Sequence, residues 1–283
     1  MKDSIYPCLW FDGQAKEAAN LYCSIFKNSK VTSDNPLVVN FELNGKKIMG
    51  LNGGPQFKLN QSISFFVNCK SEKETNEIWN KLFEGGKALM PIDKYPWSER
   101  YGWLQDKFGL SWQISLANKD DAKHQITPSL LFTGNNFGRA EEAINFYSSV
   151  FKNSLVTMLS HYPDKEHGPG KILYSEFKLD HHDFIAMDGP GNHAFSFNEA
   201  LSFVVDCQTQ EEIDYYWDKL IAGGGKESQC GWLEDKFGVS WQIVPTIIEK
   251  LMSDPKVSPG VMQAILKMKK LDIKILQEAY DQK

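Results

Sequence analysis

The sequence has few cysteines and no long run of apolar residues. Its five cysteines are widely spaced and form no Cys-x-x-Cys pair, which argues against a disulfide framework or a zinc ribbon and predicts buried, reduced thiols. No apolar run approaches the roughly 18 residues of a membrane-spanning helix. The first residues, MKDSIYPCLWFDG, lack the apolar core of a secretory signal peptide. We therefore expect a cytoplasmic protein with no membrane partner.

An excess of positive charge is also missing. The chain carries 31 basic and 36 acidic residues, a formal net charge of −5, and has no basic stripe. A nucleic-acid-binding surface needs clustered Lys and Arg to neutralise phosphates, so we expect no nucleic-acid partner. Hydrophobic residues make up 42% of the chain and aromatic residues 13%. This composition over 283 residues predicts a globular protein of about two domains.

The chain is an internal duplication. The segment GWLQDKFGLSWQI at 102–114 recurs as GWLEDKFGVSWQI at 231–243, and eleven of the thirteen positions are identical. Similarity that keeps the same order over so long a stretch indicates two tandem copies of a whole domain. Further matching segments in the same order are FKNS at 26–29 and 151–154, and ISFFVNC at 63–69 with LSFVVDC at 201–207.

The domain boundaries follow from the duplication. Residues 118–124 are polar and show neither a helical nor a strand period, so they separate the copies. We place the first domain at 1–118 and the second at 124–245. The remaining 246–283 has no counterpart in the first copy and forms a separate C-terminal tail.

Each copy repeats the order strand, helix and three strands. In the first copy, a strand at 6–11 precedes a helix at 16–26, and Asn44-Gly45 marks a tight hairpin. A second helix begins after Ser71, which forms a capping box with Glu74. Two such βαβββ modules per copy predict an α+β fold.

Strand periodicity orients the last strand of each copy. Successive side chains of a strand point to opposite faces, so Trp112 and Ile114 share one face while Ser111 and Gln113 share the other. Helices are expected to cover the apolar face. The polar face then looks into whatever the concave side of the sheet encloses, and in the second copy this face carries Ser240 and Gln242.

These segments resemble a known family. The first-copy segment YPCLWFDGQAKEAANLYCSIFKNS and the second-copy segments AMDGP and QCGWLEDKFGVSWQIVP are similar to PhnB-like proteins of the glyoxalase/bleomycin-resistance, or vicinal oxygen chelate, superfamily. The resemblance implies tandem domains in which two βαβββ modules form a curved mixed sheet around a cup. Such proteins are often labelled 3-demethylubiquinone 3-methyltransferase-like. The sequence has no glycine-rich loop between a strand and a helix to hold a nucleotide-like cofactor, so we predict no cofactor.

The resemblance also implies positions for a metal ion, which metal-dependent relatives hold in the cup with His and Glu ligands. These positions fall near Tyr6 and Thr127, near Ser62 and Ala200, and on Gln113 and Gln242. A transition-metal site needs about three imidazole, thiolate or carboxylate ligands. We therefore predict no metal. The alternative is a divergent metal-dependent lyase or dioxygenase that uses other ligands, such as Glu176 with His161.

Side chains that face the cup are the candidate ligand-binding residues. Neutral amides offer both a donor and an acceptor, and tryptophans offer stacking surfaces. Packing within the core remains the alternative for the tryptophans, satisfaction by neighbouring strands for the glutamines, and an inert small residue for the cysteine. The candidates are Trp103, Ser111, Gln113, Trp232, Ser240, Gln242 and Cys230.

The tail contains two amphipathic helices. One begins at Ser258-Pro259 and the other after Asp272, and both have apolar faces that must dock on this chain or on a second copy. Lys267, Lys269, Lys270 and Lys274 are expected on the solvated face. Because the duplication places two domains in one chain, we expect a monomer that mimics a dimer, or a homodimer. The sequence favours a metal-free protein whose cups bind a small-molecule ligand; the further alternative is a purely structural interaction module.

Overall fold

The computed structural model describes residues 4–117, 125–252 and 256–281. These residues belong to two compact units, Pro7–Leu201 and Met1–Tyr6 with Ser202–Lys283. Each unit is described by itself. The expected boundary at 118–124 lies outside the described residues, so the placement of the domains at 1–118, 124–245 and 246–283 stays a prediction.

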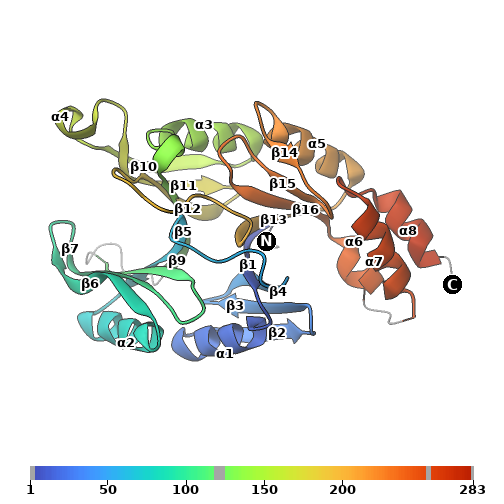
Figure 1. Cartoon of the computed structure of the whole chain (residues 1–283), viewed down its shortest axis with the longest axis horizontal. Coiled ribbons are helices and arrows are strands. Elements are labelled where there is room, and N and C mark those ends of the chain that lie inside the picture. Colours follow the sequence, from blue (N-terminus) through green and yellow to red (C-terminus); the bar gives the residue numbers. More distant parts are fainter. Residues whose placement is uncertain (1–3, 118–124, 253–255, 282–283) are drawn as a thin grey trace. The chain divides into compact units, whose positions relative to one another are not determined.

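The first copy has the expected order of elements (Figure 1). Its first module contains β1 (Ile5–Phe11), α1 (Ala15–Ile25), β2 (Lys30–Asp34), β3 (Val38–Leu43) and β4 (Lys46–Asn52). Its second module contains β5 (Ile63–Cys69), α2 (Glu72–Phe83), β6 (Lys87–Tyr95), β7 (Ser98–Gln105) and β8 (Ser111–Leu116).

The second copy repeats this order and adds the tail. Its first module contains β9 (Gln125–Phe132), the short 3-10 helix η1 (Gly134–Asn136), α3 (Ala140–Val150), β10 (Leu155–His161), α4 (Asp164–His167), β11 (Ile172–Leu179) and β12 (His182–Asp188). Its second module contains β13 (Leu201–Cys207), α5 (Gln210–Ile221), β14 (Lys226–Glu227), β15 (Trp232–Glu234) and β16 (Ser240–Pro245). The tail helices are α6 (Ile247–Met252), α7 (Ser258–Lys267) and α8 (Ile273–Asp281).

The larger unit contains a complete eight-stranded mixed sheet with the order β10-β11-β12-β9-β5-β8-β7-β6. Strands β5 and β9 pair antiparallel at its centre, with Ser64 opposite Ser129 and Phe66 opposite Thr127. This junction joins the second module of the first copy to the first module of the second copy. The α+β fold of paired βαβββ modules is confirmed, but in this sheet the two modules come from different copies rather than from one.

The strands outside this sheet are divided between the two units. The larger unit holds the order β1-β4-β3-β2, with β1 and β4 parallel, and α1 packs on β3 and β4. The smaller unit holds the order β14-β15-β16-β13, and α5 packs on β15 and β16. The predicted turn at Asn44-Gly45 is confirmed, because both residues have positive φ angles, 52° and 78°. Two residues with positive φ are what a tight type I′ hairpin requires.

Helices α2 and α3 cover one face of the eight-stranded sheet (Figure 1). Gly102 of β7 shows how closely α2 approaches, since a Cβ at this position would lie 2.4 Å from the ring of Trp79. On the same side, α1 packs against β8. Trp112 is fully buried there, with its ring centroid 5.2 Å from that of Tyr22 and 5.4 Å from that of Phe26. The predicted burial of Trp112 under a helix is therefore confirmed.

The tail helices dock in cis within the smaller unit. Their buried residues, among them Leu251, Val261 and Leu276, form one cluster. Lys270 pairs with Asp214 of α5 at 2.9 Å, and Lys269 pairs with Glu227 at 3.3 Å. Lys269 is exposed, as expected, and Lys270 is half-buried, and both side chains also tie the tail to the rest of the unit.

The predicted tail helices are found with one difference at a helix start. Asp272 caps α8 as predicted, accepting hydrogen bonds from the backbone N–H groups of Lys274 and Ile275. Helix α7 begins at Ser258 itself, so the residue before its first turn is Val257. Among the described residues, no helix is both long and apolar enough to span a membrane.

Candidate functional site

The face of the eight-stranded sheet opposite α2 and α3 is the candidate site, and we call it the cup face. Directly paired residues of neighbouring strands point to the same side of a sheet, so the register defines this face. Both copies contribute to it. Its residues include Ser64, Phe66, Tyr101, Trp103, Ser111, Gln113, Thr127, Ser129, Glu176 and Ile185.

Gln113 lies at the centre of a hydrogen-bond network on the cup face. Its Oε1 accepts a 2.8 Å bond from the Tyr101 hydroxyl, and its Nε2 donates a 2.8 Å bond to Ser64 Oγ. Burial raises the pKa of Tyr101, so the phenol keeps its proton and remains a donor. The amide is therefore held in one orientation, with one amide hydrogen of Nε2 and one lone pair of Oε1 still available to a ligand.

Trp103 and Ser111 form a second polar contact on this face. The Trp103 indole N–H donates a 2.7 Å hydrogen bond to Ser111 Oγ. The half-buried Trp103 ring packs against a cluster whose buried members are Phe66, Tyr101 and Ile185. The structure thus brings Trp103, Ser111 and Gln113 together on one face.

A row of aromatic rings crosses the cup face. At one end lies the tip of the β6–β7 hairpin, where Trp97 is 57% exposed and stacks on Tyr95 with centroids 5.1 Å apart. Tyr101 follows, 5.6 Å from Tyr95, and then Phe66, 6.4 Å from Tyr101. Tyr174 of β11 ends the row, 6.1 Å from Phe66. Four of these rings come from the first copy and one comes from the second, so the row exists only because the two modules share a sheet.

Glu176 places a carboxylate beside the end of this row. Its Oε1 accepts a 2.8 Å hydrogen bond from the Tyr174 hydroxyl. Within the described part of the chain, no Lys, Arg or His side chain forms an ion pair with Glu176. His161, its suggested partner in a metal site, lies instead 3.4 Å from Glu141 of α3, on the helix-covered side. The structure does not bring His161 and Glu176 together.

Ser129 is a buried hydroxyl without a hydrogen-bond partner among the described residues. It is 1% exposed and lies on the cup face between Ser64 of β5 and Ile185 of β12. Nearly all buried polar groups are hydrogen-bonded, to protein or to an ordered molecule, so the Ser129 hydroxyl is a hydrogen-bonding group on the cup face that the described residues leave unused.

The donor set of the cup face does not fit a transition-metal ion. The described residues contain no group of three His, Cys, Asp or Glu side chains that could hold one. Thr127 and Ser62, two of the positions that the resemblance implies for a metal ion, are buried hydroxyl residues, and the Gln113 amide is already bonded on both sides. The register also places Asp183 and Asp93 on the face that carries Glu176, but no three such side chains group together among the described residues, and a transition-metal site needs about three strong ligands.

In the smaller unit, Gln242 and Ser240 lie next to each other on β16. Gln242 Nε2 donates a 2.9 Å hydrogen bond to Ser202 Oγ, repeating the Gln113–Ser64 contact. Ser240 Oγ is buried and has no partner among the described residues. Trp232 is half-buried and lies opposite Gln242 on β15.

Cys230 lies with the tail instead. It packs against the tail cluster, and its backbone N–H donates to the carbonyl of Met268 at 2.7 Å. Burial raises the pKa of its thiol, which leaves it protonated and unreactive. A pocket role for this cysteine finds no support in its surroundings.

The tail replaces a hairpin that the second copy lacks. Fourteen residues separate Lys87 from Gly102 in the first copy, but only four separate Lys226 from Gly231 in the second. The shortened connection leaves the backbone of residues 230 and 231 without a neighbouring strand of the β6 kind, and the carbonyls of residues 268 and 269 accept their N–H groups at 2.7 Å. Cys230 precedes the repeated segment in the second copy as Tyr101 does in the first, and the difference in length explains why the two residues have different surroundings.

Sequence reasoning missed several residues of the cup face. Ser64 and Phe66 alternate along β5, and Tyr95 and Trp97 lie in a stretch that has no counterpart in the second copy. The alternating side chains of residues 63–69 could have shown that Ser64 and Phe66 share one face. No sequence signal shows that Tyr174 meets Phe66, because that contact depends on the pairing of β5 with β9.

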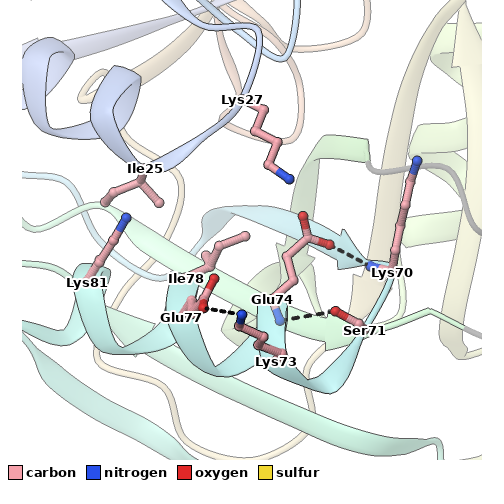
Figure 2. Close-up of a pocket in the computed structure, with 9 residues that line it drawn as sticks. All are labelled: Ile25, Lys27, Lys70, Ser71, Lys73, Glu74, Glu77, Ile78 and Lys81. Carbon is pink, nitrogen blue, oxygen red and sulfur yellow. Dashed lines mark hydrogen bonds and ion pairs between the residues drawn. The ribbon is translucent and has the colours of Figure 1, made fainter.

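A cavity of about 340 Å³ lies elsewhere in the larger unit, between α2 and the C-terminal end of α1 (Figure 2). Four lysines line it together with two glutamates. Ser71 caps α2 here, accepting a 3.2 Å hydrogen bond from Glu74 N, as predicted. Glu74 in turn accepts from Lys70 N. The first turn of α2 is thus satisfied by its own side chains, and Lys73 is paired with Glu77.

Comparison with known proteins identifies the family. The family model described as 3-demethylubiquinone-9 3-methyltransferase matches twice, over residues 3–115 and 124–244. The chain belongs to this family. Both matches together cover most of the chain, which confirms the tandem duplication.

Several solved structures are similar to all or part of the chain. A putative 3-demethylubiquinone-9 3-methyltransferase, PhnB protein, from Bacillus cereus is 35% identical and matches 39% of this chain and 96% of its own, with a TM-score of 0.37. A protein from Staphylococcus aureus is 33% identical over 41% of this chain and 97% of its own, with a TM-score of 0.19. Glyoxalase I from Zea mays is 11% identical, matches 83% of this chain and 89% of its own, and has a TM-score of 0.53. The last comparison shows the glyoxalase-like fold alone. No curated protein matches the chain.

Proposed function

We propose that this protein binds a small organic molecule on the cup face of its eight-stranded sheet, without a metal ion or cofactor and without turnover. The observation that carries the proposal is the Ser129 hydroxyl, buried with no hydrogen-bond partner among the described residues. It lies in a face that also carries aromatic rings, further hydroxyls and the fixed amide of Gln113. Aromatic walls with a few placed polar groups are typical of small-molecule sites.

The residues around the helix N-termini do not fit the cofactor that the family description implies. A nucleotide-like cofactor uses exposed backbone N–H groups at a helix start, next to a glycine-rich loop. Here Asp188 Oδ1 accepts the N–H groups of Gly138 and Ala140 at α3, and Asn52 Oδ1 accepts that of Ala15 at α1. We derive no methyl-transfer step.

A fluorescence titration tests the proposal. Tryptophan emission is followed while metabolites and antibiotics are added to the wild-type protein and to two matched variants, Trp103→Phe and Trp232→Phe. These tryptophans occupy equivalent positions in the two copies. We expect quenching that is unchanged in Trp232→Phe and reduced in Trp103→Phe, where Trp97 of the aromatic row still responds. Quenching that depends on Trp232 alone, or none with any compound, would contradict binding on the cup face and favour the structural-module alternative.

A further inference from the structure

We propose that the ligand of the cup face is an organic cation, whose positive centre lies against Glu176 and whose apolar body lies along the aromatic row. This inference rests on the proposed function, since it names the chemical class that the same site selects. It combines two observations: a carboxylate without a counter-ion and a set of rings in contact with one another.

Among the described residues, the Glu176 carboxylate forms no ion pair. Its one side-chain hydrogen bond comes from the neutral Tyr174 hydroxyl at 2.8 Å. The nearest lysine along β11, Lys178, is engaged by Asp183, and Asp183 also pairs with Lys46 at 3.3 Å. Asp183 therefore engages both lysines, and neither of them pairs with Glu176.

The rings next to Glu176 present the electron-rich faces that cations prefer. Their hydroxyls are already used: Tyr101 donates to Gln113, Tyr174 donates to Glu176, and Tyr95 donates to the carbonyl of Pro91 at 2.9 Å. With these hydroxyls bonded, the part of the rings left to a ligand is their aromatic surface, mostly that of the half-buried Tyr95 and Tyr174, because Tyr101 is 5% exposed. A cation over an aromatic face gains about 0.5–2 kcal/mol, and the gain is largest when the cation loses its water. An anion would meet both the ring faces and the carboxylate with repulsion.

The first copy has no carboxylate at the position that corresponds to Glu176. The motif Phe-Lys-Leu at 177–179 aligns with Phe-Glu-Leu at 41–43, which places Asn40 opposite Glu176 in the alignment. Asn40 donates a 3.0 Å hydrogen bond to Ser33 on the neighbouring strand, so its amide is satisfied locally. Only the module that joins the aromatic row carries a carboxylate at this position.

Three probes of nearly equal shape isolate the charge. Phenyltrimethylammonium is a cation, tert-butylbenzene replaces its nitrogen with carbon and is neutral, and benzenesulfonate is an anion. Calorimetric titration of the full chain should show binding of the ammonium probe, weaker binding of the hydrocarbon and none of the sulfonate. In Glu176→Gln, which keeps the acceptor for Tyr174, we expect the Kd of the ammonium probe to rise about tenfold and that of the hydrocarbon to stay unchanged.

Glu42→Gln is the matched control, because Glu42 lies on the equivalent strand β3, where it pairs with Lys30. This variant should bind all probes as the wild type does. Equal binding of the cation and the hydrocarbon, with no effect of Glu176→Gln, would overturn the cation inference and leave the proposed function standing. Preference for the sulfonate would do the same. Failure of all three probes together with a silent compound library would overturn both.

Discussion

The phenol of Tyr22 donates a 2.8 Å hydrogen bond to the buried Asp106. Tyr22 lies on α1, in the first module, and Asp106 lies in the turn before β8, in the second module. Asp106 also accepts the indole N–H of Trp112 at 2.9 Å and the backbone N–H groups of residues 108 and 110. One carboxylate therefore links the two modules of the first copy on the helix side. The strands of these modules do not pair with each other: β5–β8 share a sheet with strands of the second copy, and β1–β4 lie outside that sheet.

Tyr22→Phe should weaken this link. The substitution leaves a lone pair of a buried carboxylate without its donor, which typically costs about 1–3 kcal/mol of the free energy of unfolding. Urea unfolding of the variant and the wild type measures the difference. Ser24→Ala, which removes an exposed hydrogen bond from the same helix, is the control and should change little. Equal stability of Tyr22→Phe and wild type would show that the link contributes nothing.

Asp183 gives a dependence of stability on pH. Burial alone would raise its pKa, but hydrogen bonds and charge from Lys178 and Lys46 outweigh burial and lower it below the ordinary 3.8. A carboxyl group whose folded pKa is depressed stabilises the fold above its unfolded pKa and loses that contribution as pH falls through the folded pKa. Asp183→Asn should therefore be less stable than wild type at pH 7, and the difference should shrink below about pH 4. Urea unfolding at several pH values checks this, and a constant difference would contradict it.

The tail cluster should be essential for the stability of the smaller unit. Leu271 is 1% exposed and packs beside Gly231, so Leu271→Ala should destabilise the protein by about 2–5 kcal/mol. Leu266, on α7, is 60% exposed, and Leu266→Ala should leave the melting temperature nearly unchanged. Deletion of the residues after Leu251 should give insoluble or strongly destabilised protein. An unchanged melting temperature of that deletion variant would show that the tail does not hold the unit together.

Strand β10 should limit the concentration at which the protein stays in solution. It is an edge strand whose Leu155, Met158 and Leu159 are 59%, 48% and 39% exposed. The aligned edge strand β2 of the first copy carries Lys30, Ser33 and Asp34 at these positions. Charged residues on an edge strand oppose pairing with other chains. Light scattering should therefore show later aggregation for Met158→Ser with Leu159→Asp, and no change would contradict this reading.

Local patterns in the sequence predicted the local structure well. The Asn44-Gly45 turn, the Ser71 cap and the faces of β8 all follow from residue type and period, because they depend on neighbours in the chain. The same alternation correctly placed Gln113 and Ser111 away from the helices. Strand periodicity states which face a side chain takes, and this is why these residues could be found without coordinates.

The pairing between modules could not be predicted in this way. Strand β5 has the same alternating pattern whichever strand of the other module lies beside it, so its pairing with β9 leaves no local mark. The meeting of Phe66 with Tyr174, and hence the position of Glu176, depends on that pairing. The placement of Cys230 beside the tail depends on a shortened connection and on a segment with no internal counterpart. Sequence reasoning therefore found part of the cup face but not the second copy's share of it.

Diffraction from crystals soaked with para-bromophenyl trimethylammonium tests the central claim most directly, because bromine gives an anomalous signal that locates the molecule. The account predicts one strong peak on the cup face, beside the rings of Phe66 and Tyr101, with the ammonium group directed toward Glu176. A peak in the lysine-lined cavity between α1 and α2, a peak confined to the smaller unit, or no peak at a concentration that saturates binding in solution would contradict it.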